Sequence, residues 1–210
     1  MGCRLRLLFT LAVLLAGTWG VANAGVPDPA LSTVPKVLTS PGHPSTSLDY
    51  VVTVVGASGP IDSALVQLVF STEATNLICW CTGQTKPIVE KYTNASGVAR
   101  FQIFGGGCLN PANVSNPPVQ VFANGILLKQ VGIASVDPVD DAGKLPYQVG
   151  YNPAGSCKSA LSDATFITPA IKTGAANYCT DLDGDGDTDL TDAILFTPAV
   201  KAGYICTRAP

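Results

Sequence analysis

The stretch Tyr50-Val-Val-Thr-Val-Val55 decides the fold of the region around it, because β-branched and aromatic residues alternate along it as they do in a strand. Tyr50, Val52 and Val54 fall on one face of an extended strand, and the residues between them fall on the other. Further runs of this kind follow at 65–70, 88–93, 98–104, 119–123 and 126–133. Six or so short strands with no helical stretch among them predict an antiparallel β-sandwich.

Two connections in this region carry hairpin signals. Asn124-Gly125 separates the runs 119–123 and 126–133, and Asn-Gly is the strongest short hairpin signal. Asn94-Ala-Ser-Gly97 separates 88–93 from 98–104 and predicts a second hairpin-like connection.

The same region resembles the bacterial immunoglobulin-like domains of the invasin type. The resemblance rests on the run from Val51 to Phe70, with its Ala-Ser-Gly-Pro-Ile turn, and on Thr93-Asn-Ala-Ser-Gly-Val-Ala-Arg-Phe101, which matches a T-x-x-x-G-x-A-x-F segment. It covers roughly residues 48–134 and implies an immunoglobulin-like β-sandwich. It implies little about function, because one fold serves many functions.

The residues before this region predict export. Residues 1–24 combine a short basic start, an apolar run and Ala22-Asn23-Ala24, which together indicate a cleaved signal peptide. Residues 25–47 carry five prolines and predict an extended leader with little regular structure. No later apolar run approaches the roughly 18 residues that a membrane span needs. We therefore expect a secreted protein, extracellular or at the cell surface, with no membrane contact after cleavage.

Six cysteines follow residue 24, and an even number in an exported chain predicts up to three disulfides. Three lie in each half of the chain, so either one bond crosses between the halves or two thiols stay free. We expect Cys157 to pair with Cys206 as a clasp on the C-terminal region, and Cys108 to pair with Cys79 or Cys81. Cys179 is an alternative partner for either Cys157 or Cys206. Cys79-Trp-Cys81 is alternatively a metal-binding pair.

The charge is unevenly placed. Ten acidic residues lie between Asp137 and Asp192, and all of them are aspartate. The chain before residue 135 is balanced, so the acidity belongs to one segment. This pattern favours a cation as the partner and argues against nucleic acid.

Residues 159–174 and 188–203 form an internal repeat with a period of 29, and eight of the 16 positions are identical. Two such units usually pair, because a single helix cannot bury its apolar face alone. Both units contain Thr-Pro, which predicts a kinked or restarted helix. The expected small core is apolar: Leu161, Phe166, Ile167, Ile171, Leu190, Leu195, Phe196 and Val200.

Before the second unit, Asp181-Leu-Asp-Gly-Asp-Gly-Asp-Thr-Asp-Leu-Thr-Asp192 matches a 12-residue calcium loop. Ca²⁺ takes six to eight oxygens, which such a loop supplies from positions 1, 3, 5, 7, 9 and 12. The corresponding ligands are Asp181, Asp183, Asp185, the backbone carbonyl of Asp187, Asp189 through a water, and Asp192. Gly186 occupies position 6, where the chain turns sharply. Position 12 is Asp instead of the usual Glu.

The first unit has two readings. Counting back 29 residues leaves only Asp163 as a ligand, at position 12. The alternative starts the loop at Asp137, with Asp140 or Asp141 next and about 15 residues inserted before Asp163. That reading allows a second ion held by Asp137, Asp141 and Asp163, and the other reading favours an ion-free loop held by a disulfide of Cys157.

The paired units resemble a type I dockerin over about residues 135–206. The resemblance implies a small all-α domain of paired, EF-hand-like loop–helix units at 135–210. It also implies Ca²⁺ dependence and docking onto a cohesin-type domain, within an assembly that degrades polysaccharides. Loop positions 10 and 11 depart from the small hydroxyl residues that are common in dockerins. They are Leu161-Ser162 and Leu190-Thr191, which suggests a different partner or a buried role.

Three functions follow as hypotheses. The first is a secreted, non-catalytic calcium-binding protein that docks to an extracellular partner or to itself. The second is a structural subunit of an extracellular fibre or surface layer. The third is a carbohydrate-active enzyme with a dockerin tail, but the only histidine is His43 in the leader, and only Glu73 and Glu90 lie near the strands. We therefore predict that the chain has no catalytic activity.

Overall fold

The computed structural model describes residues 25–41, 48–83, 87–174 and 177–208. The predicted signal peptide, part of the predicted leader and His43 lie outside these residues. The strands are β1 (Val37–Ser40), β2 (Tyr50–Thr53), β3 (Val55–Gly56), β4 (Gly59–Pro60), β5 (Leu65–Phe70), β6 (Cys79–Trp80), β7 (Ile88–Tyr92), β8 (Val98–Phe101), β9 (Gly105–Gly106), β10 (Val119–Ala123) and β11 (Ile126–Ser135). The helices are α1 (Thr72–Leu77), α2 (Leu161–Thr173) and α3 (Leu190–Ala202), with short 3₁₀ turns η1 (Pro111–Asn113) and η2 (Pro153–Ser156).

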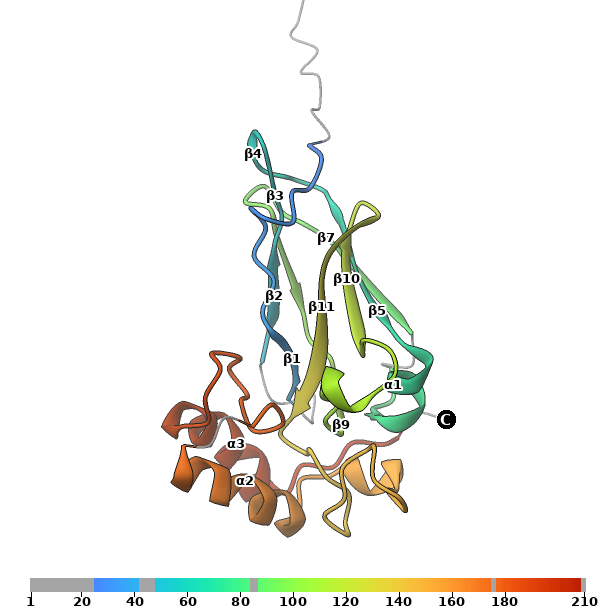
Figure 1. The fold of residues 1–210 in the computed structure, drawn as a ribbon, viewed down its shortest axis with the longest axis vertical. Coiled ribbons are helices and arrows are strands. Elements are labelled where there is room, and N and C mark those ends of the chain that lie inside the picture. The colour runs from blue at the N-terminus through green and yellow to red at the C-terminus, as the bar shows by residue number, and fades with distance from the viewer. Residues whose placement is uncertain (1–24, 42–47, 84–86, 175–176, 209–210) are drawn as a thin grey trace, which may run out of the picture.

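The strands form one five-stranded sheet and three two-stranded pairs. The large sheet has the order β1-β11-β10-β5-β7 and curls like half a barrel (Figure 1). The pair β2–β8 contributes alternate side chains to the same core as β5, β10 and β11. The pairs β3–β4 and β6–β9 lie at opposite ends of the strands (Figure 1).

The core follows the alternation in the sequence. Val66, Leu68 and Phe70 of β5 are buried, and the residues between them are only half-buried. β10 and β2 show the same period of two. The predicted hairpin between β10 and β11 is confirmed, with both turn residues at positive φ, +47° at Asn124 and +80° at Gly125.

The predicted fold class is wrong in both of its parts. No immunoglobulin-like sandwich forms in the described residues, because the five-stranded sheet faces only the short ribbon β2–β8. The connection at 94–97 is not a hairpin, since β7 pairs with β5 and β8 pairs with β2. The alternation of side chains specifies where strands form, but it does not specify their partners.

The predicted leader also differs from expectation, because it adds a strand to the sheet. β1 pairs in parallel with the end of β11, from Val37 opposite Gly132 to Ser40 opposite Ser135. A strand at this edge covers backbone groups that β11 would otherwise leave unpaired. The region from 25 to 41 therefore belongs to the folded core.

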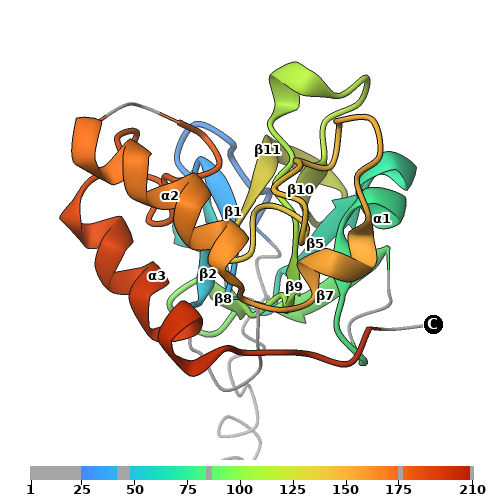
Figure 2. The ribbon, with the colours of Figure 1, turned by 90° about the horizontal axis from the view of Figure 1, so that it is seen from below.

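The repeat units do not form a helical domain of their own, which corrects the second part of the predicted fold class. α2 and α3 lie side by side at one end of the sheet (Figure 2). Their buried residues Ile167 and Phe196 share one core with Val37 of β1 and with Ala134 and Val136, at and just beyond the end of β11. The apolar faces of the helices are thus covered in part by the sheet.

Within each unit the helix runs through its proline without restarting, over 13 residues in α2 and 13 in α3. Four of the predicted core residues pack half-buried against this core: Phe166, Ile171, Leu195 and Val200. Leu161 and Leu190 were expected to be buried and are instead 76% and 71% exposed. Each stands at the first position of its helix, where the side chain points away from the sheet.

Candidate calcium loop and its repeat partner

The second loop, residues 181–192, ends on the first turn of α3, and the carboxylate of Asp192 accepts hydrogen bonds from both ends of the loop. One oxygen of Asp192 accepts a hydrogen bond from the N–H of Asp189 at 2.8 Å, and Asp189 accepts one from the N–H of Thr191 at 2.6 Å. The other oxygen of Asp192 accepts a hydrogen bond from the N–H of Leu182 at 2.5 Å. This capping arrangement turns position 12 back toward the start of the loop.

The remaining aspartates follow a series of tight turns. Asp181 accepts a hydrogen bond from the N–H of Gly184 at 2.8 Å, Asp183 from Asp185 at 3.2 Å, and Asp185 from Asp187 at 3.0 Å. Each of these bonds uses one carboxylate oxygen and leaves the second for another ligand. Gly186 has a φ of +115°, a conformation that disfavours any residue with a Cβ.

These turns gather the carboxylates into two neighbouring groups. The ligand atoms of Asp181, Asp183 and Asp185 lie within 4.8 Å of one another. The ligand atoms of Asp187, Asp189 and Asp192 form a second group with the same spacing. A donor set made only of carboxylate oxygens suits a hard cation such as Ca²⁺, and all six sequence-predicted residues of the loop lie in these groups.

Burial and the crowding of the aspartates raise the pKa values of three carboxyl groups in the loop. Burial raises the pKa of Asp181, and the nearby charge of Asp192 raises it further. Burial likewise raises the pKa of Asp192. The pKa of the exposed Asp187 is raised mainly by the charge of Asp185. Like charges held together favour either protons or a cation, so a bound Ca²⁺ would relieve the repulsion.

The loop is held against the sheet by residues that sequence reasoning missed. The hydroxyl of Thr39 donates to the carbonyl oxygen of Leu182 at 2.7 Å, and Nζ of Lys36 donates to the carbonyl oxygen of Asp185 at 3.0 Å. Leu182 itself is buried in the core between the helices and the sheet. No local signal marks Lys36 or Thr39, because each lies more than 140 residues from its partner.

The first unit repeats the same framework with a longer loop. One oxygen of Asp163 accepts a hydrogen bond from the N–H of Ala160 at 2.8 Å and the other from Val139 at 3.4 Å, as Asp192 does from Asp189 and Leu182. Val139 therefore takes the place of Leu182. The structure thus places the start of the first loop near Asp137, with an insertion before Asp163.

A second pair of contacts supports this register. Ser159 donates to Asp137 in the first unit, and the hydroxyls of Thr180 and Thr188 are 2.8 Å apart in the second. The two partners are 22 residues apart in the first unit and 8 apart in the second. Asp137 thus corresponds to the buried Thr180 of the second unit. Thr180 precedes the turns that gather the carboxylates of the second loop, so Asp137 does not correspond to any of those carboxylates.

The inserted residues use their carboxylates for other contacts. Asp140 accepts hydrogen bonds from the N–H groups of Ala142 and Lys144, both at 2.9 Å, and from Asn152 at 2.8 Å. Asp141 forms an ion pair with Lys158 at 3.0 Å. The second ion predicted at Asp137, Asp141 and Asp163 stays a prediction.

Asp137 and Asp163 remain an unusual buried pair. Oδ2 of Asp137 is buried and accepts no hydrogen bond from the residues that the structure describes. Burial raises the pKa of Asp137 well above its usual value, and the neighbouring Asp163 raises it further. Burial raises the pKa of Asp163 to about 7. A carboxyl group in this setting favours its neutral form.

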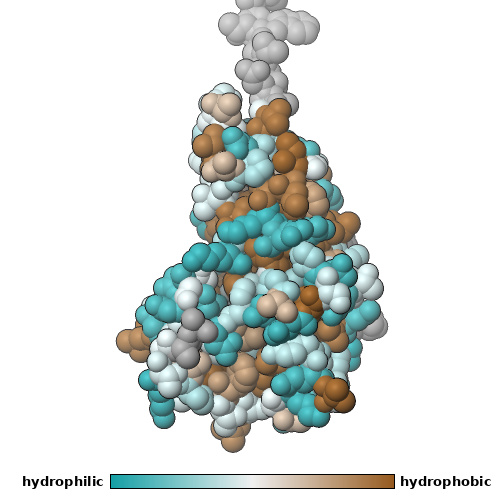
Figure 3. Space-filling model, in the orientation of Figure 1, coloured by the Kyte–Doolittle hydropathy of each residue, from teal (hydrophilic) through white to brown (hydrophobic). Residues whose placement is uncertain are grey.

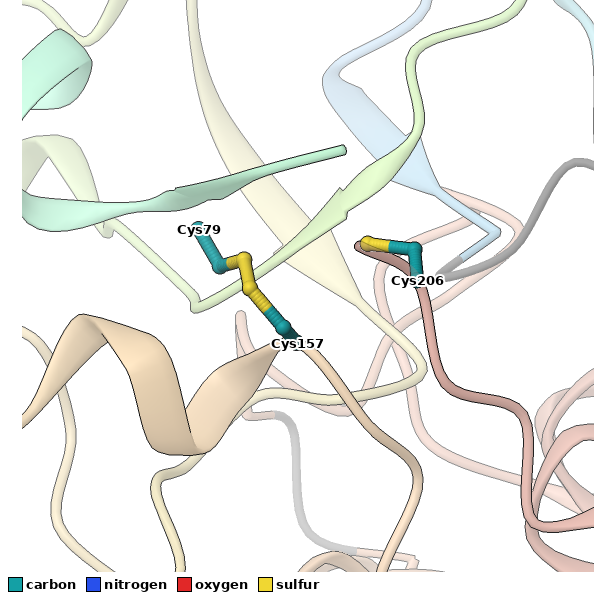
Figure 4. Close-up of side chains that lie close together, drawn as sticks. All are labelled: Cys79, Cys157 and Cys206. Carbon is teal, nitrogen blue, oxygen red and sulfur yellow. A yellow bond between two sulfur atoms is a disulfide. The ribbon is translucent and has the colours of Figure 1, made fainter. Parts of the chain in front are cut away.

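The disulfides differ from the predicted clasp. The bonds are Cys79–Cys157, Cys81–Cys206 and Cys108–Cys179, so all three cross between the two halves of the chain. The predicted pairs fail because Cys79 on β6 and Cys81 just after it are bonded to Cys157 and Cys206 of the C-terminal segments and not to Cys108. Figure 4 shows the Cys79–Cys157 bond with Cys206 beside it. Three disulfides are consistent with an extracellular protein.

The exposed face of the helices carries two matching shallow grooves. One groove runs along α2 and the other along α3, at positions 29 residues apart. The lining residues are Leu161, Ala164, Thr165, Thr168, Pro169 and Lys172 in α2, and Leu190, Ala193, Ile194, Thr197, Pro198 and Lys201 in α3. On the face drawn in Figure 3, polar residues cover much of the helical end, and hydrophobic residues are scattered among them.

In comparisons with known proteins, the chain matches no family model, no curated protein and no solved structure. Within the described residues, every helix is too short or too polar to cross a membrane.

Proposed function

We propose that this chain is a secreted, non-catalytic protein that binds Ca²⁺ at Asp181, Asp183, Asp185, Asp187 and Asp192, and that its repeat units dock onto an extracellular protein. The observation that carries the proposal is the arrangement of the loop. Its carboxylates gather in two groups along successive turns, and Asp192 closes the loop by accepting a hydrogen bond from the N–H of Leu182. Asp189 contributes through a water.

The secreted location rests on two features. Residues 1–24 have the composition of a signal peptide. The three disulfides need an oxidising compartment to persist. Ca²⁺ is plentiful outside cells, so even a site of modest affinity stays filled there.

The docking role rests on the exposed apolar residues of the helices. Leu161, Leu190 and Ile194 are 76%, 71% and 64% exposed, and each lies in one of the two matching grooves. Because α3 begins directly at the calcium loop, the ion would fix the groove on α3 in place. A cohesin-type domain is the partner that the dockerin resemblance implies, and self-association is the alternative.

Titration calorimetry with Ca²⁺ on the mature protein tests the metal site. Wild type should bind Ca²⁺ and melt at a higher temperature with the ion than with a chelator, and Asp181→Ala should lose both effects. Asp62→Asn is the matched control, since Asp62 is exposed in a turn far from the loop. A wild-type melting temperature that ignores Ca²⁺ would sink the proposed site.

Docking needs a separate measurement. We expect immobilised cohesin domains to retain the protein in Ca²⁺ and to release it in chelator, with Leu161→Ser plus Leu190→Ser abolishing retention. Val149→Ser serves as control, because Val149 is 95% exposed and lies outside the helices. Retention that survives the double variant would remove the grooves from the proposal. Calcium-dependent sedimentation as large assemblies would favour the fibre alternative.

A further inference from the structure

Two of the three disulfides lie next to each other at the seam between β6 and the C-terminal segments. The sulfur atoms of Cys79, Cys157 and Cys206 all lie within 4.8 Å of one another. Cys206 is bonded to Cys81, and Cys79 is bonded to Cys157. Figure 4 shows the sulfur of Cys206 on the side that faces the Cys79–Cys157 bond. Cys206 therefore has a second possible partner beside its present one.

The backbone already places Cys157 and Cys206 opposite each other. The N–H of Cys206 donates to the carbonyl oxygen of Cys157 at 2.9 Å, and Lys158 and Ile205 form an antiparallel bridge one residue away. Opposed residues on antiparallel segments have Cα atoms about 4.5–5.5 Å apart. Disulfides span about 4.4–6.8 Å between Cα atoms, so a Cys157–Cys206 bond fits this backbone.

The two cysteines left over by such a bond, Cys79 and Cys81, lie two residues apart in the chain. Cys79 and Cys81 flank Trp80 on an extended segment, so their side chains leave the same face. Two residues of strand span about 6.6 Å, which is near the upper end of the disulfide range. The Cβ atoms of a disulfide lie about 3.5–4.5 Å apart, so a Cys79–Cys81 bond requires this segment to bend out of its extended conformation and out of its pairing with β9.

We propose that Cys79, Cys81, Cys157 and Cys206 form a thiol–disulfide exchange site with two covalent states. In the state seen here, both bonds join β6 to the C-terminal segments. In the exchanged state, Cys157 pairs with Cys206 and Cys79 pairs with Cys81. The number of disulfides is the same in both, so the exchange needs a thiol as catalyst but no net oxidant or reductant.

The exchange balances in three steps. An external thiolate attacks the sulfur of Cys81, forms a mixed disulfide with it and releases the thiolate of Cys206. Cys206 then attacks the sulfur of Cys157, forms the new bond and releases the thiolate of Cys79. Finally, Cys79 attacks the sulfur of Cys81 in the mixed disulfide, closes the second bond and releases the external thiolate.

The entry point is the Cys81–Cys206 bond. Cys206 is 7% exposed, and its neighbour Ile205 is 64% exposed. The segment is held to the residues that follow β6 by hydrogen bonds such as that from the N–H of Thr82 to the carbonyl oxygen of Thr207 at 2.8 Å. Opening these few bonds exposes the disulfide to a thiol in solution.

Exchange changes how the calcium-loop end of the molecule is attached. The two disulfides that link β6 and the residue after it to the C-terminal segments are lost. Cys108–Cys179 is then the one disulfide that still joins the two halves of the chain. The exchanged state therefore loosens the seam while keeping the helices tethered just before the second loop. A thiol-bearing partner or small thiol outside the cell would in this way set the attachment of the proposed docking face.

Peptide mapping of the whole, unreduced protein tests this. Trypsin separates Cys157 and Cys206 into different peptides, 145–158 and 202–208, and keeps Cys79 and Cys81 together in 37–91. The state seen here gives one species of three linked peptides. After incubation with a low concentration of reduced glutathione and acid quenching, we expect that species to decline and the linked pair 145–158 with 202–208 to appear in its place.

The Cys81→Ser variant gives a second measurement that does not depend on the thiol. It should show Cys157 bonded to Cys79 in part of the molecules and to Cys206 in the rest, with the remaining cysteine alkylated. Cys108–Cys179 should persist in every sample and serves as the internal control. The proposal is overturned if glutathione yields only free thiols, or if Cys157 stays with Cys79 alone in the variant.

Discussion

The hydroxyl of Thr39 donates a hydrogen bond to the carbonyl oxygen of Leu182 at 2.7 Å, across 143 residues of chain. Thr39 belongs to β1, the edge strand that extends the sheet, and Leu182 is the second residue of the proposed calcium loop. The loop is therefore attached at its first turn to the sheet, and its order depends on a strand at the other end of the chain.

Thr39→Val should weaken both folding and calcium binding. The substitution leaves the carbonyl of Leu182 without its donor, which costs about 1 kcal/mol of the free energy of unfolding. Calcium affinity, measured by calorimetry, should fall with it. Thr82→Val removes a more exposed hydroxyl–carbonyl bond, to Thr207 at 3.0 Å, and this bond involves no residue of the loop. It should lower stability and leave the affinity unchanged, and equal affinities for all three proteins would contradict the attachment.

Calcium binding should release protons and weaken as the pH falls. The pKa values of Asp181, Asp187 and Asp192 are raised by burial and by neighbouring aspartates, so the metal-free loop holds protons at a pH where an isolated aspartate has lost them. Calorimetry in two buffers of different ionisation enthalpy measures this release directly. An apparent enthalpy that is independent of the buffer at pH 5 would contradict the crowding of the loop.

Asp137→Asn should flatten the pH dependence of stability. The folded protein raises the pKa of Asp137, whereas the unfolded chain releases that proton above about pH 4. The contribution of Asp137 to stability is therefore fully present below that pH and declines as the pH rises toward the folded pKa. Asparagine does not titrate, so the decline should be smaller. Denaturant unfolding at pH 5 and pH 8 in saturating Ca²⁺ measures the difference, with Asp62→Asn as a control that should behave as wild type.

Removing the Cys108–Cys179 bond should be strongly destabilising. It joins residues 71 apart. A closed loop of this length stabilises the folded state by roughly 4 kcal/mol in the chain-entropy model. The Cys108→Ala, Cys179→Ala double variant should melt many degrees below wild type in calorimetry. A melting temperature within a degree of wild type would mean that these two cysteines are not paired in solution.

The purified chain should hydrolyse no polysaccharide. Glu73 accepts a hydrogen bond from the N–H of Ser115 at 3.2 Å, and Glu90 accepts one from the side chain of Gln67 at 2.6 Å. Glu73 lies on α1 and Glu90 on β7, and the two carboxylates accept these hydrogen bonds from different elements. Release of reducing sugar from a polysaccharide panel, lost in Glu73→Gln or Glu90→Gln, would overturn the expectation.

The sequence alone was sufficient for the local features. The alternation of Val66, Leu68 and Phe70 specified a strand, and Asn124-Gly125 specified a hairpin, because both depend on neighbouring residues only. The spacing of aspartates around Gly186 likewise specified a loop that gathers its carboxylates, which the structure shows in two groups of three. The 29-residue period specified two matching helices and their equivalent Asp163 and Asp192.

Only the tertiary structure decided which elements meet. β1 pairs with β11, and β7 pairs with β5 and not with β8, which differs from the predicted sandwich. All three disulfides cross between the halves of the chain, which differs from the predicted Cys157–Cys206 bond. An antiparallel strand can pair with any other strand of matching length and hydrophobic face, and six cysteines allow 15 pairings. The choice among these partners depends on packing the whole core at once, which no local pattern records.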